Sequence, residues 1–66
     1  MNEIKTRIES VLTDLRRAKS EKRDAEYDAR RWGNTLIEEQ MADDAELIEE
    51  AILKIEEGLE LLDNVK

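Results

Sequence analysis

The chain has no cysteine, no histidine and no proline among its 66 residues, and it has only two glycines. Without cysteine it cannot form a disulfide, and without cysteine or histidine it cannot hold a tetrahedral structural zinc ion. A chain of this length buries little apolar surface by itself and usually needs a disulfide, a metal or self-association. Self-association is therefore the expected source of additional stability.

The same absences argue against an enzyme. General bases that work near neutral pH are most often histidines, and neither Ser10 nor Ser20 has a recognisable activating partner. Asp43 and Asp44 lack the spacing of a calcium loop, and a di-metal site in a helical bundle needs histidine ligands. We therefore expect no catalytic residue, no cofactor and no metal site.

Long hydrophobic runs are also absent. The first residues, MNEIKTRIESVLTDL, interleave charged and apolar side chains, and the longest later apolar cluster is AIL at 51–53. Secretory signals and membrane spans both need a longer apolar block. The sequence predicts no membrane segment and a cytoplasmic protein.

Charged residues and strong helix formers are abundant, and aliphatic residues recur among them at helical intervals. Charged residues make up 44% of the chain, yet disordered chains lack such periodicity. Steps of four and three define a first apolar row: Ile4, Ile8, Val11, Leu15, Ala18, Lys22, Ala25, Ala29 and Trp32. A second row comprises Met41, Ala45, Ile48, Ile52, Ile55, Leu59 and Leu62. These rows predict helices over about 2–32 and 35–64.

The two rows are out of phase, and the break lies where the sequence favours a turn over 33–34. Gly33 suits a left-handed helix cap, and Thr35 with Glu38 fits a capping box. Asp43 offers a second possible start, which leaves open an interruption of the second helix near 42–44. We expect one all-α domain over 1–66, a coiled-coil-like antiparallel helical hairpin in which position i lies opposite about 67 − i.

Further apolar residues lie beside the two rows and are expected to be exposed in a monomer. They are Leu12 in the first helix and Leu36, Leu47, Ala51, Leu61 and Val65 in the second. Dimerisation of two hairpins into a four-helix bundle would cover these residues. The alternative is that they only widen the buried stripe of each helix.

Lys22 is the one polar member of the first row. A polar residue at such a position can specify register or oligomeric state. Alternatively, its aliphatic stem lies along Ala45 and its amine pairs with an acid such as Glu46 or Glu49. Charge is divided between the halves, since residues 1–33 carry a net charge of +2 and residues 34–66 carry −9.

Trp32 lies beside the predicted turn with basic and aromatic neighbours. One interpretation is a structural plug, with the indole folded over the turn against Leu36 or Ile37. The other is contact with a protein partner, because tryptophan, tyrosine and arginine are the residues enriched in interface hot spots. The candidate contact residues are Trp32, Arg30, Arg31 and Tyr27.

Three functions are compatible with these features. The first is a homodimeric protein-interaction module that acts as a regulator, adaptor or inhibitor of a protein partner. The second is nucleic-acid binding through the basic residues of the first helix; the layout is similar to that of the plasmid copy-control Rop hairpin, a dimeric RNA-binding bundle. Acids interleaved among those basic residues and the net charge of −7 oppose it. The third is an acidic mimic of nucleic acid that inhibits a DNA-binding protein.

Overall fold

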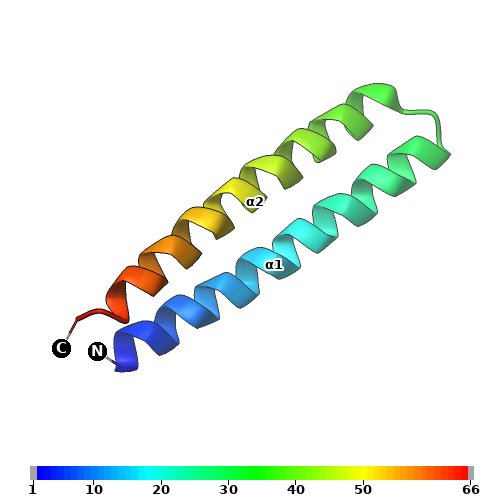
Figure 1. Ribbon diagram of the computed structural model, residues 1–66. Helices are drawn as coiled ribbons and strands as arrows, with labels where there is room; N and C mark the ends of the chain where they lie inside the picture. Colours follow the sequence, from blue (N-terminus) through cyan, green and yellow to red (C-terminus); the bar gives the residue numbers. More distant parts are fainter. Residues whose placement is uncertain (1, 66) are drawn as a thin grey trace.

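The computed structural model describes residues 2–65 and contains two antiparallel helices joined by a short turn (Figure 1). Helix α1 spans Asn2–Arg31 and helix α2 spans Thr35–Leu62, where the sequence predicted 2–32 and 35–64. Both ends of the chain lie at the end of the hairpin opposite the turn (Figure 1). The prediction of an all-α helical hairpin is confirmed.

Helix α2 is continuous through Asp43 and Asp44, so the possible second start is not used. The reason is that Met41, Ala45 and Ile48 keep a single apolar phase across this segment. All three side chains are buried or half-buried against α1. Breaking the helix at 42–44 would remove that burial as well as the backbone hydrogen bonds.

The turn is built from backbone caps at Gly33 and Asn34. Gly33 has a φ of +71°, which a residue with a Cβ adopts only at a cost, and its N–H donates to the carbonyl of Arg30 at 3.1 Å. The N–H of Asn34 donates to the carbonyl of Ala29 at 2.8 Å. These two bonds form a Schellman motif, which satisfies carbonyl groups at the end of α1.

Asn34 also begins the second helix, and this corrects the predicted capping box. Its side-chain oxygen accepts a hydrogen bond from the N–H of Ile37 at 3.2 Å, so Asn34 and not Thr35 is the N-cap. Glu38 does not return to the helix start, because its carboxylate accepts a hydrogen bond from Arg30 Nε at 2.8 Å instead. The cap therefore lies one residue earlier than expected.

Each helix contributes one row of eight residues to the line of contact, which we call the seam. In α1 the row is Lys5, Ile8, Leu12, Leu15, Lys19, Lys22, Glu26 and Ala29. In α2 it is Glu38, Met41, Ala45, Ile48, Ile52, Ile55, Leu59 and Leu62. All sixteen are buried or half-buried, and the most buried are Leu12, Ala29, Ala45 and Ile52.

Helix α1 is rotated about its axis relative to the sequence prediction. Leu12, expected to be exposed, is only 3% exposed, whereas Val11, expected in the seam, is 48% exposed. This rotation buries the larger of two adjacent aliphatic side chains. It also places Lys19 opposite the acids of α2, where its amine pairs with Glu49 at 2.6 Å.

Ion pairs across the seam agree with the expected register. Lys5 pairs with Asp63, Lys19 with Glu49, and Arg30 with Glu38, and the two numbers of each pair add to 68. Ion pairs at a solvated surface contribute little free energy, on the order of 1 kcal/mol or less. Their effect is to favour this register over alternatives that would bring like charges together.

We predict that Leu12→Ala lowers the free energy of unfolding by about 2 to 4 kcal/mol, because it opens a cavity in the seam. Leu53→Ala is the matched control, since Leu53 lies in the interior of α2 but is half exposed. It is expected to cost less than about 1 kcal/mol. Urea unfolding followed by circular dichroism measures both, and equal losses would contradict the seam described here.

We also predict that Gly33→Ala destabilises the hairpin by about 1 to 2 kcal/mol, because alanine is strained at a φ of +71°. Gly33→Asn should cost less, since asparagine tolerates the left-handed conformation better. Thermal unfolding of the two variants measures the difference. An alanine variant as stable as the asparagine variant would argue against the Schellman turn.

Candidate functional site

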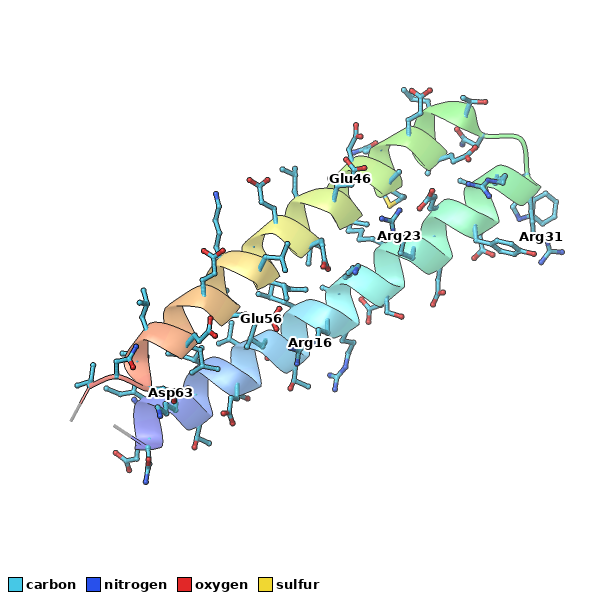
Figure 2. The ribbon with its side chains drawn as sticks, in the orientation of Figure 1. Arg16, Arg23, Arg31, Glu46, Glu56 and Asp63 are labelled. Carbon is cyan, nitrogen blue, oxygen red and sulfur yellow. The ribbon has the colours of Figure 1, made fainter. Side chains whose placement is uncertain are left out.

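The two sides of the seam have different chemistry. On one side, which we call the charged edge, α1 places Arg16, Arg23 and Arg30, and α2 places Glu56 and Asp63. Figure 2 shows Arg16 and Glu56 near each other between the helices, and their closest charged atoms are 3.5 Å apart. The hollows on this edge are lined largely by charged side chains. It is a solvated, ion-paired surface.

The opposite side of the seam is mostly apolar, and we call it the apolar face. It contains two rows in which residues recur every seven positions and so lie on one side of a helix. The α1 row comprises Ile4, Val11, Ala18 and Ala25. The α2 row comprises Ile37, Asp44, Ala51 and Gly58, and Val65 follows beyond the end of α2. Asp44 is the one charged member of either row.

A shallow hollow of about 370 Å³ lies on the apolar face near the open end of the hairpin. Ile8 and Val11 of α1 and Ile55, Gly58 and Leu62 of α2 contribute to its walls. Gly58 leaves space there, because a Cβ at this position would meet no atom within 4 Å. The hollow is therefore apolar and open to solvent, which suits an incoming aliphatic side chain.

Further leucines extend the apolar surface around α2. Leu47 and Leu61 occupy the row that adjoins the apolar face, and both are exposed, as are Leu36 and Val65. The prediction that these four side chains are exposed in the hairpin is confirmed. Several exposed aliphatic residues on one flank are typical of a contact surface.

Two of the predicted self-association residues are less exposed than these four. Leu12 is buried in the seam and contacts the other helix of its own chain, so its predicted exposure is wrong. Ala51 is half-buried within the apolar face. The sequence prediction also missed Asp44 and Gly58 as members of this face. Their seven-residue spacing from Ile37, Ala51 and Val65 was the available signal.

Lys22 pairs with Asp44, with Nζ and Oδ2 3.3 Å apart. The expectation that it pairs with an acid of the second helix is confirmed, but the partner is neither Glu46 nor Glu49. Asp44 is on the apolar face, whereas Glu49 lies on the charged edge and pairs with Lys19. Both side chains of the Lys22–Asp44 pair remain about one-third exposed.

The turn end carries the predicted aromatic and basic cluster. Trp32 is 83% exposed, so the predicted plug is wrong for the hairpin by itself. Trp32 lies just beyond the end of α1, and the nearby Leu36 is itself exposed and covers little of the indole. Tyr27 is also mostly exposed. Tertiary packing brings no large residue over either ring.

Arg30 and Arg31 differ in their contacts. Arg30 bonds to Glu38 and lies 3.6 Å from Glu26, and the hydrogen bond to Glu38 raises the pKa of its guanidinium above the usual value. Arg31 makes no ion pair with any residue in 2–65. Figure 2 shows Arg31 at the turn end, pointing away from α2. Trp32, Tyr27 and Arg31 thus form an accessible group, and Arg30 is held by the hairpin.

Within residues 2–65, no group of three or more acidic side chains is arranged to hold a metal ion. Over the same residues, neither helix combines the length and apolar character needed to cross a membrane. Comparison of the chain with protein-family models, with curated proteins and with solved structures found no match.

We predict that Trp32→Ala changes the free energy of unfolding by less than about 0.5 kcal/mol, since an exposed side chain loses little packing when truncated. Thermal and urea unfolding should be measured at a protein concentration where the chain is monomeric. A loss of several kcal/mol under those conditions would restore the structural plug.

Proposed function

We propose that this chain is a non-enzymatic protein-interaction module, a hairpin that self-associates into a four-helix bundle and acts as a regulator, adaptor or inhibitor of a protein partner. The observation that carries the proposal is the apolar face, which extends along both helices on one side of the seam. Ile4 and Val11 of α1 are each about half exposed on it, as is Val65, which follows the end of α2.

The size of the apolar face supports self-association. The hairpin extends 53 Å by 15 Å, so one broad side is large enough to bury about 800 Å² of accessible surface, the amount that each partner loses in a typical stable interface. Burying an exposed aliphatic side chain contributes roughly 1.5 to 3 kcal/mol. With no cysteine to form a disulfide, a second copy is a direct source of such burial.

Contact with a different protein is assigned to the turn end. Trp32, Tyr27 and Arg31 are accessible there and belong to the residue types that dominate interface energetics. The turn holds them at the end of two rigid helices, which lowers the entropy that binding must remove. These side chains lie at the end of the hairpin that carries the turn, whereas the apolar face extends along both helices.

The ion pairs weaken the case for nucleic-acid binding. Acids of α2 and its C-cap, Asp63, hold five of the cations of α1: Lys5, Arg16, Lys19, Lys22 and Arg30. Phosphate binding needs cations that are available to replace counterions. A protein in which these cations pair with its own acids, and which carries a net charge of −7, is poorly suited to binding nucleic acid.

A second candidate, inhibition of a DNA-binding protein by mimicry of nucleic acid, is favoured by one observation. Several exposed acids of α2 make no ion pair within residues 2–65: Glu39, Asp43, Glu46, Glu57 and Glu60. An acidic surface of this kind attracts basic partners. The two candidates differ in the partner, and the dimer is common to both.

We predict a dimer mass at micromolar concentration by light scattering, and a monomer mass for Val11→Glu. The added carboxylate would be buried in the interface without a partner, and a buried unpaired charge is strongly unfavourable. Leu53→Glu is the matched control, because Leu53 is 53% exposed on a different side of its helix. It should leave the mass unchanged.

A monomer mass for the unchanged chain, with full helicity by circular dichroism, would contradict self-association. Equal dissociation by the two glutamate variants would mean that the apolar face is not the interface. To separate the candidate partners, the unchanged chain and Trp32→Ala are used as baits. A protein that the unchanged chain captures and Trp32→Ala does not would support partner binding at the turn end. A nucleic-acid enzyme that both baits capture would support mimicry of nucleic acid.

A further inference from the structure

We propose that the second copy packs on the apolar face with its turn beside the turn of the first, so that each α1 lies over the α2 of the other copy. This inference rests on the proposed self-association and specifies its geometry. The ion pair on the apolar face, the hollow at Gly58 and the charges of the two helices all favour this geometry.

Two symmetric arrangements bring one apolar face onto another. A two-fold axis along the length of the hairpin places the turns together and puts α1 over α2. A two-fold axis across the hairpin places the turns at opposite ends and puts α1 over α1 and α2 over α2. Dimers of identical chains are most often two-fold symmetric, so these are the arrangements to compare.

The Lys22–Asp44 pair distinguishes them. These residues lie at the same height along the hairpin, since their charged atoms are 3.3 Å apart. An axis along the hairpin preserves height, so Lys22 of one copy lies over Asp44 of the other. The two lysines and two aspartates then alternate around a square, and each charge has two neighbours of opposite sign.

The alternative axis leaves this pair poorly satisfied. Because α1 spans residues 2–31, an axis across its centre places Lys22 near Val11 of the other copy. The ion pair would then be covered by aliphatic side chains, and its loss of hydration would have no compensating contact. Charge complementarity thus favours the arrangement with the turns together.

The hollow at Gly58 favours the same arrangement. Val11 lines this hollow together with Ile55 and Gly58, so these residues share a height along the hairpin. With the turns together, Val11 of the second copy therefore enters the space that Gly58 leaves open. Further along, Ala18 lies over Ala51, and small residues permit close helix packing.

The overall charges of the helices agree. Residues 1–33 carry +2 and residues 34–66 carry −9. With the turns together, each acidic α2 lies over the basic α1 of the other copy. The alternative brings two strongly acidic helices together, which costs affinity through like-charge repulsion.

This geometry has a functional consequence. Both copies of Trp32, Tyr27 and Arg31 lie at one end of the dimer. A partner that carries two copies of the same recognition element can then bind both of these groups at once. This raises its apparent affinity for the dimer without any new kind of contact.

Charge exchange tests the square. Lys22→Asp places two acids on each copy, and Asp44→Lys places two lysines, so each variant alone surrounds the square with like charges. We expect each homodimer to be weaker by roughly tenfold or more. Mixing the two variants places the two acids of one copy over the two lysines of the other, so the charges across the interface are again opposite, and native mass spectrometry should show the heterodimer in excess. Two helical variants that mix without heterodimer preference would overturn the square.

Spin-label distances test the orientation independently. Because the chain has no cysteine, Thr35→Cys accepts a single label at the turn end. Helices pack about 10 Å apart, so with the label tethers included the two labels should lie within about 30 Å. Turns at opposite ends would give a distance near the hairpin length of 53 Å.

A mixed sample supplies the control, with Thr35→Cys on one copy and Asn64→Cys on the other. In the mixed dimer, the distance between the label at position 35 of one copy and the label at position 64 of the other should be long with the turns together and short with the turns apart. A dimer with a long Thr35 distance overturns the proposed orientation and leaves self-association intact. A monomer without dipolar coupling overturns the proposed function as well.

Discussion

Each helix of a two-helix hairpin can bury only the side that faces the other helix, and the rest of this structure depends on that constraint. The burial concentrates on Leu12 and Ala29 of α1 and on Ala45 and Ile52 of α2. Within residues 2–65, every other apolar side chain is at least partly in contact with water. A seam this narrow leaves apolar surface uncovered, and the chain has no cysteine with which to compensate.

The two sides of the seam differ, since ion pairs line one side and apolar residues line the other. Arg16 and Lys19 of α1 meet Glu56 and Glu49 of α2 along the charged edge. These pairs contribute little free energy individually, but they discriminate between registers. The apolar face also contains the Lys22–Asp44 pair, and a polar feature on an apolar surface gives an interface its specificity.

Residues that close the turn and a residue that is exposed to solvent lie next to each other in the sequence. Gly33 and Asn34 close the backbone, and neither needs Trp32 for this purpose, since their hydrogen bonds are to backbone and cap groups. The indole is therefore left exposed at the end of a rigid element. Interfaces commonly use aromatic side chains presented in this way, because little conformational entropy is lost on binding.

The sequence by itself determined the helices, the turn at Gly33 and the antiparallel register, because helical periodicity, a left-handed cap and charge complementarity are local or pairwise signals. It could not determine the rotation of α1. A row from Ile4 through Val11 and a row from Lys5 through Leu12 are both consistent with the apolar periodicity, and only packing against α2 selects Leu12. The exposure of Trp32 and the placement of Asp44 on the apolar face were likewise decided by tertiary structure, because both depend on which side of each helix the other one covers.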